Sequence, residues 1–106
     1  MTARSDQGML LARMEAARND IRHHLLVIER LIAARAERVT ITDRIKRRQD
    51  SRSASSWTSV DEGLFQQHVA ELSLDRRAEI DALMRKLDRQ DNAIAAFRSR
   101  HHIPAA

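Results

Sequence analysis

The stretch between Met9 and Asp50 contains no glycine and no proline. Glycine and proline are the strongest local helix breakers, and this stretch is rich in Leu, Ile, Ala, Arg and Glu, which helices tolerate or favour. A helix over residues 9–48 would be roughly 60 Å long at 1.5 Å per residue. A compact domain of this chain length has a radius of gyration of only about 13 Å. We therefore expect a rod or a hairpin rather than a globule.

The apolar residues of the chain are mainly aliphatic, because Trp57, Phe65 and Phe97 are the only aromatic side chains. Aliphatic residues at helical spacing favour helix–helix packing over a β-sandwich or barrel. Cysteine is absent, which excludes disulfides, thiolate metal sites and thiol nucleophiles. No apolar run is long enough for a signal peptide or a membrane span. We therefore expect a cytoplasmic protein that does not insert into membranes.

A polar, serine-rich window at residues 49–58 interrupts the helical pattern and predicts a loop. Ser59 and Glu62 have the spacing of a capping box, which predicts that a second helix starts at residue 59 and runs to residue 100. A kink or a break near Ser73, within residues 73–75, is left open, because the apolar spacing changes there. The whole chain, residues 1–106, is then one helical domain, an antiparallel coiled-coil hairpin with disordered ends at residues 1–8 and 101–106.

Apolar residues repeat at alternating steps of three and four in both helices, which predicts a helix–helix seam. The seam residues that we assign to an interface are Ile21, Leu25, Ile28, Ile32, Ile80, Leu83, Leu87 and Ile94. The run from Leu25 to Ile28 covers most of the helix circumference and is expected to be the most buried part. A second stripe lies beside the seam and consists of Leu11, Ala17, Leu31, Ala34, Ile41 and Ile45. Two helices cannot cover both stripes, so we expect a protein partner or a homodimer.

Charge is distributed unevenly along the chain. Residues 1–56 carry a net charge of +5, residues 57–106 a net charge of −1, and almost every cation is arginine. The basic cluster at the end of the first helix contains Arg44, Lys46, Arg47, Arg48 and Arg52. Such a cluster can contact phosphate, but it also complements the negative end of a helix dipole, which we favour. Nucleic acid is thus the less favoured partner.

The segment Arg18-Asn19-Asp20-Ile21-Arg22-His23 resembles the R-N-x-x-x-H signature of HEPN ribonucleases. The resemblance implies a helical ribonuclease toxin in which Arg18, Asn19 and His23 act on a scissile phosphate. The family places this motif late in its domain, whereas here it lies in the first turns. The alternative is that Arg18 and His23 are solvated side chains of an amphipathic helix, and we favour that alternative.

A second alternative comes from the spacing of Arg18, Arg35 and Lys46, which resembles the cationic set on the long helix of all-helical chorismate mutases. The resemblance implies an enzyme that binds a dicarboxylate, with Glu62 in place of the family's glutamate. The acidic-x-x-Arg-Glu motif that opens the family's second helix is missing.

Histidines occur as adjacent pairs, His23-His24 and His101-His102. Adjacent residues on a helix point about 100° apart, whereas metal-binding pairs on helices need a spacing of four. We therefore expect no metal site and no cofactor.

The segments Ile21–Arg30 and Arg76–Lys86 resemble parts of the two long helices in the central-stalk coiled coils of type III secretion and flagellar export ATPases. This resemblance implies a non-enzymatic bacterial protein whose helical hairpin inserts into a ring ATPase. We therefore predict a helical interaction or assembly protein, such as a stalk or chaperone-like component of a secretion apparatus, rather than an enzyme.

Overall fold

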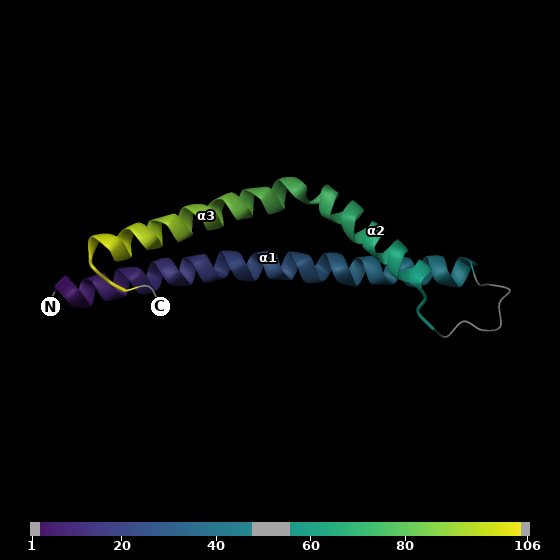
Figure 1. The fold of residues 1–106 in the computed structure, drawn as a ribbon, viewed down its shortest axis with the longest axis horizontal. Coiled ribbons are helices and arrows are strands. Elements are labelled where there is room, and N and C mark those ends of the chain that lie inside the picture. The colour runs from purple at the N-terminus through teal and green to yellow at the C-terminus, as the bar shows by residue number, and fades with distance from the viewer. Residues whose placement is uncertain (1–2, 48–55, 105–106) are drawn as a thin grey trace. The chain divides into compact units, whose positions relative to one another are not determined.

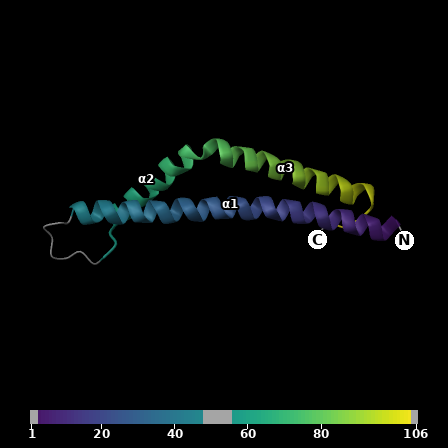
Figure 2. The same ribbon diagram turned by 180° about the vertical axis from the view of Figure 1, so that it is seen from behind.

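The computed structural model describes residues 3–47 and 56–104 and contains three helices. They are α1 (Ala3–Arg47), α2 (Ser59–Asp75) and α3 (Arg77–Arg100). The chain divides into two compact units, which we call the first unit (residues 1–26 and 79–106) and the second unit (residues 27–78). In the first unit α3 runs antiparallel to α1, and in the second unit α2 does so (Figures 1 and 2). The expected all-α helical hairpin is confirmed.

Helix α1 is 45 residues long and covers the stretch without breakers. It begins at Ala3, six residues before the expected start at Met9. Gly8 therefore lies inside a helix, where a single glycine costs about 1 kcal/mol and does not end it. Asp6 in the first turn and Arg44, Lys46 and Arg47 in the last turn complement the helix dipole. The expected disorder of residues 1–8 thus differs from the structure over residues 3–8.

The core of the first unit is formed where α3 packs on the first turns of α1. Leu11, Ile94 and Phe97 are buried together, and Met14 and Ile103 pack against them. The antiparallel packing places Arg98 3.3 Å from Glu15 and His24 3.8 Å from Glu79. Leucine, isoleucine and phenylalanine at helical spacing are sufficient for this packing.

The segment after α3 folds back instead of extending, which differs from the expected disorder at residues 101–106. The Ile103 amide donates to the Arg98 carbonyl at 2.8 Å, and the His102 amide donates to the Ser99 carbonyl at 3.4 Å. His102 has a φ of 53°, in the left-handed region. These features define a Schellman motif, in which an apolar residue after the cap contacts the helix. Ile103 fills that role, while residues 105–106 lie outside the described part.

The second unit is built on a row of residues spaced by four along α1. Ile28, Ile32, Ala36 and Thr40 are buried, and the Thr40 hydroxyl donates to the Ala36 carbonyl at 2.7 Å. The small residues Ala36 and Thr40 at the end of this row let α2 approach closely. The run from Leu25 to Ile28 is not the most buried part, because Leu26 and Val27 are exposed. Ile28 belongs to this buried row, whereas Leu26 and Val27 lie outside the row and face solvent.

Helix α2 begins at Ser59 as expected, but its capping box lies one residue earlier than predicted. Thr58 is the N-cap, and its hydroxyl accepts from the Asp61 amide at 3.2 Å. The Asp61 carboxylate accepts in return from the Thr58 amide at 2.8 Å. Threonine and aspartate share the three-residue spacing with Ser59 and Glu62, so the sequence pattern fits both pairs. Of the predicted loop, residues 49–55 lie outside the described part.

Ser73 lies inside α2, and its hydroxyl donates to the Val69 carbonyl at 2.7 Å. The helical assignment is interrupted at Arg76, three residues further on, where the Arg76 amide donates to the Ser73 carbonyl. A hydroxyl bonded four residues back often bends a helix. A kink near Ser73 stays a prediction.

None of the helices in the described part combines the length and apolarity that crossing a membrane requires.

Candidate interaction surface

The eight residues of the predicted seam differ in burial. Four of them are buried, namely Ile21, Ile28, Ile32 and Ile94. The other four are half-buried, namely Leu25, Ile80, Leu83 and Leu87. Their role in an interface stays a prediction.

A row of apolar residues on α1 is exposed along the second unit. The row follows alternating steps of four and three with an arginine at position 38, and we call its apolar residues the α1 stripe: Val27, Leu31, Ala34, Ile41 and Ile45. Leu31 is 52% exposed and Ile45 is 65% exposed. At 100° per residue the stripe is centred away from the buried row, which faces α2, but Leu31 lies at its edge and borders α2. The stripe therefore presents a second apolar face to solvent.

Arg38 falls in phase with the α1 stripe, at the position between Ala34 and Ile41 where a coiled coil has a seam residue. It is exposed, and no ion pair with another described residue holds it. The stripe is thus apolar along its length with one positive charge near its centre.

A groove between α1 and α2 adjoins the stripe, and we call it the basic groove. Its volume is about 340 Å³. Two arginines come from α1 and one from the C-cap of α2, and the complete lining is Leu31, Ile32, Arg35, Arg38, Leu72, Asp75 and Arg76. The groove shares Leu31 with the stripe and contains Arg38, which lies in the same phase as the stripe, so groove and stripe form one continuous surface.

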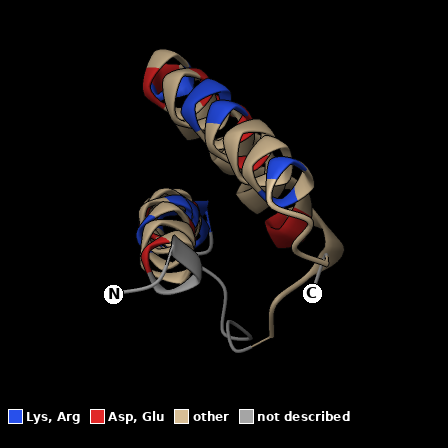
Figure 3. Cartoon of the chain, turned by 90° about the vertical axis from the view of Figure 1, so that its left-hand side faces the viewer, with Lys and Arg blue, Asp and Glu red and all other residues tan. Residues whose placement is uncertain are grey.

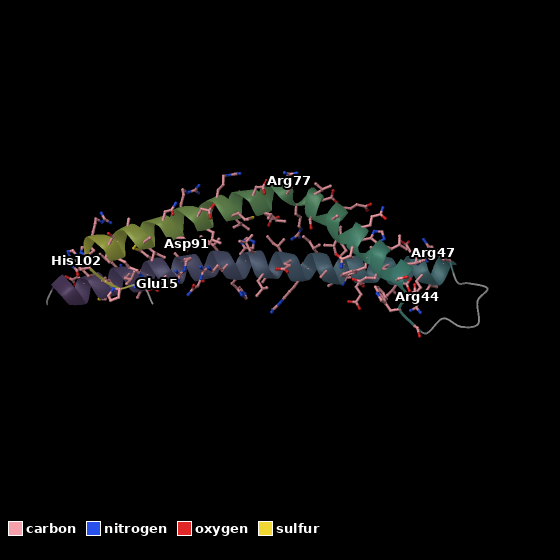
Figure 4. All side chains as sticks on the ribbon, in the orientation of Figure 1. Glu15, Arg44, Arg47, Arg77, Asp91 and His102 are labelled. Carbon is pink, nitrogen blue, oxygen red and sulfur yellow. The ribbon has the colours of Figure 1, made fainter. Side chains whose placement is uncertain are left out.

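Two arginines of the basic cluster at the end of α1, Arg44 and Arg47, form contacts within the chain. Arg47 lies 3.1 Å and Arg44 lies 3.5 Å from the carboxylate of Asp61, which is fully buried. Arg44 and Arg47 lie on the last turns of α1 (Figure 4). Hydrogen bonds from the Thr58 backbone and side chain and from Arg47, together with the charge of Arg44, lower the pKa of Asp61 against the opposing effect of desolvation. Arg48 and Arg52 lie outside the described residues.

The start of α2 carries a second polar cluster around the indole of Trp57. The Trp57 ring packs edge-on against Phe65, with ring centroids 6.2 Å apart, and its Nε1 donates to Glu62 at 2.9 Å. Hydrogen bonds from Gln66 and Trp57 lower the pKa of Glu62. These contacts orient the indole on α2 and leave it partly exposed.

Carboxylates surround the candidate ribonuclease residue Arg18 in the first unit. Its guanidinium lies 3.8 Å from Glu15 and 3.9 Å from Asp91. Arg22 also pairs with Asp91, at 3.6 Å. Figure 3 shows charged residues of both signs along α3. The positive charge of Arg18 is therefore largely compensated within the chain.

The other two residues of the candidate ribonuclease motif, Asn19 and His23, are exposed on α1. A spacing of five residues turns the Arg18 and His23 side chains about 140° apart. The structure thus brings Arg18 together with Glu15 and Asp91 and does not bring it together with His23.

The mutase-like set of cations is not gathered in one groove. Arg35 lines the basic groove, whereas Lys46, eleven residues further along α1 and about 16 Å away, does not. Arg18 lies in the ion pairs of the first unit. Glu62 lies beside Trp57 in a hollow that it shares with Glu37 and Phe65.

The histidines do not form a metal site in the described part of the chain, where no three His, Asp or Glu side chains come together to hold an ion. His24 faces Glu79 at 3.8 Å. His101 packs on Phe97, with ring centroids 4.4 Å apart. His68 lies 3.0 Å from Asp43 and links α2 to α1.

Two residues of the surface, Arg38 and Arg76, were not singled out by the sequence. Arg38 could have been found from its phase, because it continues the repeat of Leu31, Ala34 and Ile41. Arg76 lies four residues after Leu72 and four before Ile80, but this spacing does not predict that it lines a groove. It reaches the groove only because α2 ends there, and sequence spacing alone does not show that.

No protein family, curated protein or solved structure matches this chain.

Proposed function

We propose that this chain is a non-enzymatic interaction or assembly protein that binds a partner protein through the α1 stripe. The exposed second apolar face of α1 carries the proposal. Scattered apolar residues are normal on a protein surface, but a continuous row in heptad phase is typical of a helix that has another helix against it.

The energetics support this use of the stripe. Fully burying a leucine or isoleucine side chain contributes about 1.5–3 kcal/mol. Leu31, Ile41 and Ile45 are at least partly exposed and available for that contribution. These residues lie on α1, which α2 already holds on its other face, so α1 does not have to fold when a partner binds. A preformed surface binds with less entropic loss than a segment that folds on contact.

The finer identity stays a proposal. The resemblance to export-ATPase stalks suggests a bacterial secretion apparatus, where the partner would be a ring ATPase. Neither the ribonuclease nor the mutase alternative has a supporting observation of its own, because Arg18 is paired with carboxylates and Lys46 lies outside the groove of Arg35.

Site-specific photo-crosslinking in cells that express the protein naturally tests the proposal. A photoreactive amino acid at Ile41 should give one dominant protein adduct of fixed mass, and Leu31→Glu should abolish it. Met84, which is 52% exposed on α3, provides the matched control position. Adducts that are equal at both positions, or that persist with Leu31→Glu, would refute the proposal.

A further inference from the structure

We propose that the partner of the α1 stripe is an acidic amphipathic helix of another protein, whose carboxylates bind in the basic groove. This inference rests on the proposed function and adds the chemistry of the partner.

The basic groove has unsatisfied positive charge. Arg35, Arg38 and Arg76 line it together, and within the described residues no carboxylate forms an ion pair with any of them. Asp75 is the one acidic residue of the lining. Guanidinium groups bind carboxylates through paired hydrogen bonds, which fix both position and orientation. The apolar floor, made by Leu31, Ile32 and Leu72, suits an aliphatic side chain beside the carboxylate.

Arg38 imposes a condition on any helix that covers the stripe. A partner helix lying on Leu31 and Ile41 must also cover Arg38, which lies between them in the same phase. Removing a guanidinium from water without a counter-charge is costly, so an uncharged apolar partner is disfavoured. A glutamate or aspartate opposite Arg38 removes that cost. The stripe thus selects for an acidic partner.

A second copy of the chain does not meet this condition. Antiparallel pairing about residue 36 matches Leu31 with Ile41 and Val27 with Ile45, so the apolar residues alone would permit it. The same register places Arg35 opposite its own copy and Glu37 opposite its own copy on the flanks. Parallel pairing places Arg38 against Arg38 inside the seam. Like charges at these positions disfavour self-association and direct the stripe to a different chain.

Phosphate-bearing partners fit the surface less well. Nucleic-acid binding typically pairs cations with aromatic side chains that stack on bases, whereas the stripe is aliphatic. A helix that lies on an anionic membrane needs a broad apolar face, and Arg38 interrupts this narrow one.

Binding of three synthetic helical peptides to the full chain tests the inference. All three carry leucine and isoleucine at the seam positions of four heptads, and they differ only in glutamate, glutamine or lysine at the flanking positions. We expect the glutamate peptide to bind at least tenfold more tightly than the glutamine peptide in fluorescence anisotropy, and the lysine peptide to bind more weakly still. The preference should shrink as salt is raised.

Charge reversal provides the matched variants. Arg35→Glu with Arg38→Glu should weaken the glutamate peptide at least tenfold and improve binding of the lysine peptide. Arg85→Glu with Arg89→Glu makes the same change in net charge at exposed positions of α3. This control should leave the affinity for the glutamate peptide and for the lysine peptide unchanged. Circular dichroism checks that both double variants remain helical. A switch of preference cannot come from unfolding, because an unfolded chain would lose both peptides.

Several results would overturn the inference. Equal affinity for all three peptides, lost with Leu31→Glu, would show that the stripe binds helices without a preference for acidic residues. That result would refute the acidic partner. Tighter binding to duplex RNA or to phosphatidylserine vesicles than to the glutamate peptide would assign the groove to phosphate. A concentration-dependent dimer in sedimentation, abolished by Leu31→Glu, would assign the stripe to a second copy. Failure of the crosslinking at Ile41 would instead refute the proposed function itself.

Discussion

Arg47 on the last turn of α1 donates a hydrogen bond to Asp61 on the first turn of α2, with Nη2 and Oδ1 3.1 Å apart. Asp61 also closes the capping box with Thr58 and lies 3.5 Å from Nε of Arg44. One carboxylate therefore caps a helix and ties it to its neighbour. Its complete burial makes it the residue on which this end of the second unit depends.

Replacing Asp61 by asparagine should destabilise the protein. The substitution keeps the shape but removes the charge, so Arg44 and Arg47 lose their counter-ion and the cap loses its charged acceptor. We expect a lower midpoint in urea unfolding followed by circular dichroism. Asp88→Asn removes one carboxylate from an exposed position of α3 and should leave the midpoint within error. Equal midpoints for both variants would contradict the assigned role of Asp61.

The same carboxylate predicts a pH dependence with a definite sign. Asp61 has a pKa below its ordinary value of 3.8 in the folded chain, chiefly because the Thr58 backbone amide hydrogen-bonds to it. A lowered folded pKa contributes stability that is complete above the unfolded pKa and is lost as pH falls through the folded one. The stability difference between the natural protein and Asp61→Asn should be constant from pH 7 to about pH 5 and shrink below about pH 3.8. A difference that grows on acidification would refute this.

The residue sequence predicted the long helix α1 well, because the absence of breakers between Met9 and Asp50 is a local property that needs no tertiary information. It did not predict that the covered row of α1 would continue from Ile28 and Ile32 through Ala36 and Thr40. Two apolar rows overlap there, one through Ile28 and Ile32 and one through Leu31 and Ile41, and both satisfy helical periodicity. The row with Ala36 and Thr40 is buried, because small side chains allow close packing. That choice depends on α2.

The candidate surface was predictable only in part, for the same reason. The stripe containing Leu31, Ile41 and Ile45 follows from the sequence, as does the expectation that two helices leave it uncovered. The basic groove does not follow, because it combines Arg35 with Arg76, which are far apart in the chain. The end of α3 was also misjudged, since His102 adopts a conformation typical of glycine and the sequence gives no sign of it.

Replacing His102 by glycine should stabilise the protein. A residue with a side chain costs roughly 1–2 kcal/mol in the left-handed region, and glycine avoids most of that cost at the price of greater freedom when unfolded. We expect a gain of up to about 1 kcal/mol in the free energy of unfolding. His101→Gly is the matched control and should destabilise, because His101 packs on Phe97. A loss of stability with His102→Gly would argue against the Schellman cap.

Burial in the first unit predicts unequal effects of two truncations. Ile94 is buried against Leu11 and Phe97, so Ile94→Ala should cost about 2–5 kcal/mol. Leu10 is about half exposed, and Leu10→Ala should change stability by less than about 0.5 kcal/mol. Urea unfolding at constant pH measures both. A larger effect at Leu10 would mean that the first unit packs in a different register.

Because Arg18 is paired with carboxylates, we expect the protein to have no ribonuclease activity. Arg18→Ala leaves Asp91 with Arg22 alone and removes methylene packing, so a modest loss of stability is expected, on the order of 1 kcal/mol. His23 is exposed on α1 and is turned about 140° from Arg18, so His23→Ala should change neither stability nor binding. Incubation of purified protein with single-stranded RNA should give no cleavage for the natural chain or for either variant. Metal-independent cleavage that disappears with His23→Ala, in a chain that keeps its helical content, would establish the ribonuclease and displace the interaction protein.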